Sequence, residues 1–259
     1  MKHIIHLFLL FTLPIFAQKT IETSFIKKIG FNADTIITID NFETTYYISN
    51  NVFNKKGIAK TITYNNLQLG DLNSANAFNS LKINLFYKDF NTVIILDNRL
   101  AEIFKIDFNT LTEYKSVSHV STGHDNTLWI FNQDFQKLEL FDYKSQTTRA
   151  QTVPIQSNIL DLKSNYNYCW LLTEDYLYIY NYFGSLVKKL KNIGYTSLME
   201  SNGNIILKKE NTLFYLKKNS DTSIPIKTPN LLIDQFFVTN ETLYIYSNKT
   251  LQQFHLKIN

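Results

Sequence analysis

Short runs of Ile, Val, Leu, Phe and Tyr alternate along the chain with clusters of Asn, Asp, Ser and Gly. No long stretch places apolar residues at the i, i+3, i+4, i+7 spacing of an amphipathic helix. One order recurs six times: an apolar strand, a polar turn and a second strand. These six phrases span residues 44–56, 81–98, 126–143, 167–182, 203–218 and 241–257. The pattern predicts an all-β protein.

The phrases repeat with a period near forty residues. Their equivalent positions are Tyr46, Leu85, Trp129, Trp170, Ile206 and Tyr244, spaced 36 to 44 residues apart. Paired hairpins at this period are typical of β-propeller blades. We therefore expect a six-bladed β-propeller, with residues 18–259 forming a single domain. An open β-solenoid or two sandwiches are the structural alternatives, and the shortened last repeat argues against a solenoid.

A shorter strand precedes each phrase, and in a propeller this first strand lines the central channel. The six lie at residues 34–40, 72–78, 116–122, 159–163, 196–200 and 232–238. The last phrase stops at Ile258, which leaves the sixth blade one strand short. We expect residues 24–30 to close the ring beside residues 251–258, with Phe25, Ile26 and Ile29 supplying buried apolar contacts.

The first residues have the features of a secretory signal peptide. Lys2 precedes an apolar run over residues 4–16, and Ala17 is a small residue at the expected cleavage position. A buried first helix is the alternative. Neither this run nor any later segment has the length of about 20 apolar residues that a spanning helix needs. We expect residues 1–17 to be removed, and the mature protein to be periplasmic, attached to the outer membrane only through a partner.

Composition excludes several classes of function. One Cys, five His and seven Gly leave little material for zinc clusters, disulfides or phosphate-binding loops. The net charge is +4, but Arg99 and Arg149 are the only arginines and the lysines are scattered. Nucleic-acid binding requires clustered basic residues on one face. We expect no cofactor, no metal, no catalytic residues and no nucleic-acid partner.

Five polar residues fall on the predicted channel strands. The candidate channel-lining residues are Asn76, His119, Asp161, Glu200 and Asp234. A hydrated lining is the favoured interpretation, since no positioning Arg or glycine-rich loop accompanies them. Carboxylates at a channel mouth are also able to bind a cation or act as an acid and base pair. His119 and His124 lie near one another, yet no Asp, Glu or Cys repeats beside them to complete a metal site.

Other conspicuous side chains have structural interpretations. Trp129 and Trp170 occupy one repeat position, which favours packing between blades over ligand stacking. Cys169 lies in an apolar strand, as an inert buried thiol would. A tyrosine series at positions 176, 178, 180 and 182 either packs between blades or forms a partner surface.

Loops at residues 87–91, 132–135, 173–175 and 181–184 are the candidate contacts for a protein partner, because loops on a rigid scaffold carry recognition. The candidate partner-binding residues are Tyr87, Phe90, Phe135, Tyr182 and Phe183. Exposed aromatics in such loops also serve as simple hairpin contacts.

Three segments, residues 66–108, 164–191 and 236–246, resemble a family of exported propeller-like proteins of flavobacteria. That family includes periplasmic plug subunits of the type IX protein-secretion translocon. The resemblance implies a non-enzymatic interaction module that docks on an outer-membrane translocon, and it brings no catalytic residues. The alternative from another class is a propeller-type hydrolase or lyase with a central cation held by Asp161, Asp234 and Asn76. A lectin-like propeller is a third option, but the repeats share no polar pocket pattern.

Overall fold

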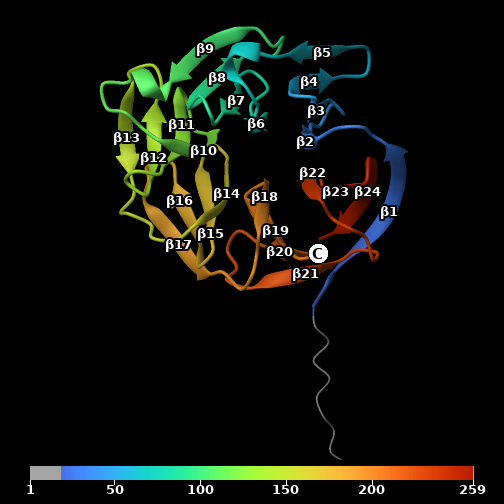
Figure 1. Cartoon of the computed structure of the whole chain (residues 1–259). Helices are drawn as coiled ribbons and strands as arrows, with labels where there is room; N and C mark the ends of the chain where they lie inside the picture. Colours follow the sequence, from blue (N-terminus) through green and yellow to red (C-terminus); the bar gives the residue numbers. More distant parts are fainter. Residues whose placement is uncertain (1–18, 259) are drawn as a thin grey trace, which may run out of the picture.

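The computed structural model describes residues 19–258, in which 24 strands and two single-turn helices are arranged as a ring around a central channel (Figure 1). The predicted signal peptide at residues 1–17 lies outside the described residues. Most strands follow one another in sets of four, and within each set the chain runs from the channel outwards to the periphery. The prediction of an all-β propeller is confirmed.

Four sheets are separate four-stranded antiparallel blades, each with its strands in chain order. The first contains β2 (Thr35–Ile39), β3 (Thr45–Ser49), β4 (Val52–Lys56) and β5 (Thr61–Tyr64), and the second contains β6 (Ser74–Asn76), β7 (Ile83–Tyr87), β8 (Thr92–Leu96) and β9 (Glu102–Asp107). The third contains β10 (Val117–Thr122), β11 (Thr127–Asn132), β12 (Lys137–Asp142) and β13 (Thr147–Gln151), and the fourth contains β14 (Ile159–Ser164), β15 (Tyr168–Thr173), β16 (Tyr176–Asn181) and β17 (Leu186–Lys191). The helices η1 (Leu67–Leu69) and η2 (Phe108–Thr110) lie in the connections between blades.

The other eight strands form one sheet. Its order is β18 (Ser197–Ser201), β19 (Asn204–Lys209), β20 (Thr212–Leu216), β21 (Ser223–Lys227), β1 (Ile21–Gly30), β24 (Thr250–Lys257), β23 (Thr242–Ser247) and β22 (Gln235–Thr239). The prediction of six blades is therefore wrong, because the structure has four blades and this eight-stranded sheet. The cause is β1, which pairs with β24 on one edge and, in parallel through Ile21 and Glu22, with β21 on the other.

The N-terminal strand pairs where the sequence predicts it. Ser24 lies opposite His255 and Gly30 lies opposite Thr250. The predicted burial of its apolar side chains is wrong: Phe25 is 60% exposed, and Ile26 and Ile29 are also exposed. At Thr23–Gly30 the strand lies at the periphery with a partner strand on one side only, and every residue from Phe25 to Gly30 is exposed, so neither face of this part of the strand is covered. Ile21 is the buried contact of this strand.

The hydrophobic core lies between neighbouring sheets. Trp129 packs with Leu162 and Cys169 of the next blade, and Trp170 packs with Leu198 of the eight-stranded sheet. Both tryptophans are buried, which confirms their expected packing role. Tyr180 lies in the same cluster as Trp129 and Tyr178 packs against that cluster, whereas Tyr182 is exposed, so only the middle of the tyrosine series packs between blades. Burial raises the pKa of the Cys169 thiol well above its usual range, as expected for an inert thiol.

Candidate functional site

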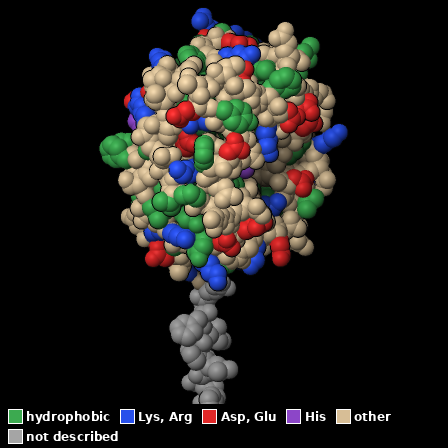
Figure 2. Space-filling view, turned by 60° about the vertical axis from the view of Figure 1, so that its left-hand side comes forward, with side chains coloured by type: hydrophobic (Ala, Val, Ile, Leu, Met, Phe, Trp, Pro, Cys, Tyr) green, Lys and Arg blue, Asp and Glu red, His purple; other side chains and the backbone are tan. Residues whose placement is uncertain are grey.

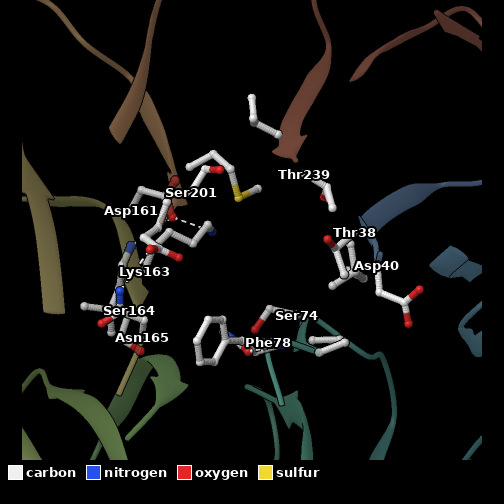
Figure 3. A pocket seen from close by; sticks show the side chains of 18 of the residues that line it. Thr38, Asp40, Ser74, Phe78, Asp161, Lys163, Ser164, Asn165, Ser201 and Thr239 are labelled. Carbon is white, nitrogen blue, oxygen red and sulfur yellow. Dashed lines mark hydrogen bonds and ion pairs between the residues drawn. The ribbon is translucent and has the colours of Figure 1, made fainter. Parts of the chain in front are cut away.

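A cavity of about 870 Å³ lies at the centre of the ring (Figure 3). All six inner strands line it, together with residues of the turns that follow five of them, for example 40–42, 165–167 and 202–203. We call the end of the ring that carries these turns the mouth. A cavity of this size is typical of sites that hold a small ligand or part of a partner.

Polar side chains join the inner strands to each other around the cavity. The innermost strand of a sheet has a free edge, whose N–H and C=O groups need partners. The carboxylate of Asp161 on β14 accepts a hydrogen bond from the N–H of Leu198 on β18 at 2.9 Å. Gln235 on β22 accepts one from the N–H of Ile36 on β2 at 2.7 Å. These bonds satisfy backbone groups of one sheet with side chains of its neighbour.

The structure brings four of the five predicted channel residues together. Asn76, His119, Asp161 and Glu200 line the cavity. Asp234 does not, because it precedes β22 and is exposed away from the lining. From this part of the chain the cavity is lined by Val238, Thr239 and Asn240, at the other end of β22.

The charged groups of the cavity are partly paired. The other oxygen of Asp161 contacts Nζ of Lys163 at 2.8 Å. Burial lowers the pKa of His119, and the carboxylate of Asp161 opposes that effect. Burial raises the pKa of Glu200, while hydrogen bonds from the Gly203 N–H and the Asn165 side chain oppose it. The cavity therefore holds a histidine that favours its neutral form and a carboxyl group that is costly to ionise.

Aromatic side chains stand on the rim of the mouth. Phe78, in the turn after β6, and Tyr166, in the turn after β14, meet edge to face with ring centroids 5.0 Å apart. Both rings are nearly half exposed, and Phe42 in the turn after β2 is 81% exposed. Sequence reasoning missed these three residues. A signal existed for Phe42 and Phe78: each follows an Asp or Asn by two positions, and that side chain accepts the aromatic residue's N–H and forms a tight turn.

The predicted partner-binding residues do not form one surface. Tyr87 is only 1% exposed and cannot contact a partner, so its assignment is wrong. Phe90 and Phe135 lie in the second hairpin turns of their blades, at the end opposite the mouth, because successive turns of an antiparallel blade alternate between its two ends. Tyr182 and Phe183 lie at the mouth end, but on the outer hairpin of the fourth blade, with ring centroids 4.0 Å apart.

Within residues 19–258 no group of three or more His, Cys, Asp and Glu side chains is placed to hold a metal ion. The cation set of Asp161, Asp234 and Asn76 is not assembled, because Asp234 lies outside the cavity. His124 instead packs against the ring of Tyr182, with centroids 5.4 Å apart. In the same part of the chain, no helix has the length and hydropathy to cross a membrane.

A ring of antiparallel sheets around an axial cavity defines a β-propeller, and solved propellers are similar to this chain. A catalytically inactive variant of virginiamycin B lyase from Staphylococcus aureus, with quinupristin, has a TM-score of 0.62 at 11% identity, over 88% of this chain and 82% of that one. A streptogramin B lyase has a TM-score of 0.60 at 12% identity, over 85% and 78%.

A third similar structure is PorZ of Porphyromonas gingivalis, described as an essential bacterial surface component of the type-IX secretion system. Its TM-score is 0.52 at 12% identity, over 87% of this chain but 32% of PorZ. No protein-family model matches the chain, and no curated protein matches it significantly. At these identities the similarities concern the fold alone.

Proposed function

We propose that this protein is a non-enzymatic binding module that docks a protein partner at its mouth. The observation that carries the proposal is the placement of Phe42, Phe78 and Tyr166 as exposed aromatics around an open polar cavity. Aromatic side chains beside a pocket are typical of the residues that dominate protein interfaces. The rigid ring beneath the turns keeps them in place without a partner, which reduces the entropy lost on binding.

The partner in this proposal is a component of an outer-membrane protein-secretion translocon of type IX. Two observations support it: the sequence resemblance to exported propeller-like proteins of flavobacteria, and the shared fold with PorZ. Export through the predicted signal peptide, and a periplasmic location, belong to the same proposal. The side of the molecule in Figure 2 mixes basic, acidic and hydrophobic side chains, a composition that suits a protein interface better than a nucleic acid.

Affinity capture with matched variants tests this function. The tagged protein is incubated with outer-membrane extract, and bound proteins are identified by mass spectrometry. The triple variant Phe42→Ser, Phe78→Ser, Tyr166→Ser removes the aromatic rim, whereas Phe90→Ser with Phe135→Ser changes two exposed aromatics at the opposite end. We expect the first to lose translocon components and the second to retain them. Retention by the rim variant, at an unchanged unfolding temperature, contradicts the proposal.

A second candidate is a lyase acting in the cavity, and one observation favours it. His119 and Glu200 line the same cavity, and burial moves their pKa values in opposite directions, as in enzymes that pair a base with an acid. Incubation with quinupristin, followed by mass spectrometry, tests this candidate. A product that forms with the wild type, and not with His119→Asn, would support it. Because a lyase that opens a cyclic substrate by elimination leaves its mass unchanged, the product is recognised by its chromatographic retention and its fragmentation pattern. Quinupristin that is unchanged in both excludes activity on that compound.

A further inference from the structure

Glu200 presents one free carboxylate oxygen to the cavity. Its Oε1 accepts two hydrogen bonds, from the Gly203 N–H at 2.8 Å and from the Asn165 amide at 2.9 Å. Its Oε2 receives none from the described residues, and no ion pair among those residues involves Glu200. Two donors thus fix the carboxyl group in position while its second oxygen stays available to a ligand.

The other charged side chains of the lining already have partners. Asp161 is paired with Lys163. Both oxygens of Asp40 have donors, namely the N–H groups of Phe42 and Thr44 and the hydroxyl of Tyr46, all of which are hydrogen bonds within the turn and strand that follow it. Nζ of Lys218 lies 5.1 Å from the centre of the Tyr168 ring, in a cation–π arrangement. Glu200 is therefore the charged group of the cavity whose hydrogen-bonding capacity is least satisfied.

The geometry favours one kind of cation. A guanidinium group binds a carboxylate best through two parallel hydrogen bonds, one to each oxygen. In Glu200 one oxygen is occupied twice, which leaves a single acceptor. An ammonium group is a compact donor that needs one carboxylate oxygen and is able to direct its other N–H bonds to neutral oxygens. The hydroxyl groups of Ser201 and Thr239 also line the cavity and are neutral oxygens of this kind, although the Thr239 hydroxyl itself donates to the Ile39 carbonyl (Figure 3).

We propose that the cavity binds a primary ammonium group, the side chain of a lysine presented by the docked partner, through Oε2 of Glu200. The inference rests on the proposed function, because it assumes that the mouth receives a partner segment. The aromatic rim formed by Phe78 and Tyr166 would pack against the residues that flank the lysine. Because burial raises the pKa of Glu200, a bound cation would favour its ionised form, so affinity rises with pH as that group ionises.

Blocked pentapeptides test the inference directly. The probe is fluorophore-labelled Gly-Phe-Lys-Phe-Gly-amide, compared by fluorescence polarisation with the same peptide carrying acetyl-lysine or arginine. We expect acetylation to weaken binding at least tenfold and arginine to bind several-fold more weakly than lysine. Glu200→Gln, which keeps the side-chain shape, should reduce the lysine affinity to that of acetyl-lysine and remove the rise with pH. Glu210→Gln, on an exposed hairpin turn, is the matched control and should bind as the wild type does.

Two results would overturn the inference: equal binding of lysine and acetyl-lysine peptides, or lysine binding that Glu200→Gln leaves unchanged. Absence of any peptide binding also contradicts it. The proposed function fails separately, if the rim variant still captures translocon components. Capture that depends on the rim but not on Glu200 would retain the docking function and reject the ammonium site.

Discussion

Asp161 on β14 accepts a hydrogen bond at 2.9 Å from the backbone N–H of Leu198 on β18, and its other oxygen lies 2.8 Å from Nζ of Lys163. One side chain thereby satisfies the free edge of the neighbouring sheet and neutralises a cation in the cavity. The joint between the fourth blade and the eight-stranded sheet is therefore polar at the channel and apolar further out, where Trp170 packs with Leu198.

Replacing Asp161 tests this joint. Asp161→Ala leaves the Leu198 N–H without its acceptor and Lys163 without its partner, so we expect a loss of about 1–3 kcal/mol in the free energy of unfolding. Asp161→Asn keeps an oxygen for Leu198 and should cost less. Urea unfolding measures both. The exposed Asp175→Ala should change stability by no more than about 0.5 kcal/mol. Equal stability of Asp161→Ala and the wild type would show that the joint contributes nothing.

A second prediction concerns the buried ion pair within the third blade. Nζ of Lys115 lies 2.7 Å from Glu139, and the two side chains are only 7% and 3% exposed. Burial alone would raise the pKa of Glu139, but hydrogen bonds from Lys115, Thr148 and Asn132 hold it below its usual range. Glu139→Ala leaves the buried ammonium group of Lys115 without a partner and should lower the free energy of unfolding by about 3–5 kcal/mol.

The double variant Lys115→Met, Glu139→Leu distinguishes the charge effect from lost packing. It removes both charges and should be more stable than Glu139→Ala, as calorimetry would show. If the double variant were less stable than Glu139→Ala, the unpaired charge of Lys115 would not be the cause of the loss of stability.

The third prediction separates the contributions of the two closing strands, β1 and β24. Phe25 and Phe254 are paired across β1 and β24, with ring centroids 5.7 Å apart, but Phe254 is buried and Phe25 is largely exposed. Phe254→Ala should cost about 3–5 kcal/mol through the cavity it creates. Phe25→Ala should cost about 1 kcal/mol or less. Denaturant unfolding measures the loss of stability in both variants. Similar losses would contradict the exposure of Phe25 on β1.

The strands and their order within each blade are predictable, because the same short sequence pattern recurs in every blade. Tyr46, Trp129 and Trp170 recur at one period because each lies in the second strand of its blade, where both faces are packed. The pairing of β1 with β21 is not marked by any repeated sequence pattern. It depends on Ile21 and Ile226, two residues far apart in the chain with no local signature.

The two wrong predictions at the site, for Tyr87 and Asp234, arise from where each residue lies relative to its strand. Tyr87 ends β7 rather than beginning a loop, and Asp234 precedes β22 rather than lying within it. Both faces of β7 are buried, so Tyr87 is covered, and β22 reaches the cavity only at Val238 and Thr239, four residues beyond Asp234. The separation of Phe90 and Phe135 from the mouth was available from the sequence, because hairpin turns alternate between the ends of a blade. The free oxygen of Glu200 was not, because it depends on Asn165 of another sheet.

The fourth prediction concerns pH. Burial lowers the pKa of His119, so the unfolded chain binds the proton more readily than the folded chain. The contribution of this residue is therefore fully present above the unfolded pKa of about 6.5 and decreases as pH falls through that value. The free energy of unfolding at pH 7.5 and pH 5 should decrease more for the wild type than for His119→Asn. Equal decreases in both proteins would show that His119 is not linked to folding.

The pairing of β1 with β24 also sets the order of events as the chain is made. The first described strand leaves the ribosome long before its partner, since 220 residues separate Gly30 from Thr250. At about 5–20 residues per second, roughly 10–40 seconds pass between them. During that interval β1 has two unpaired edges and carries Phe25, Ile26 and Ile29, which invites pairing with other chains. The ring therefore closes only after the last strand has been made, and β1 stays without its long partner for the whole of synthesis.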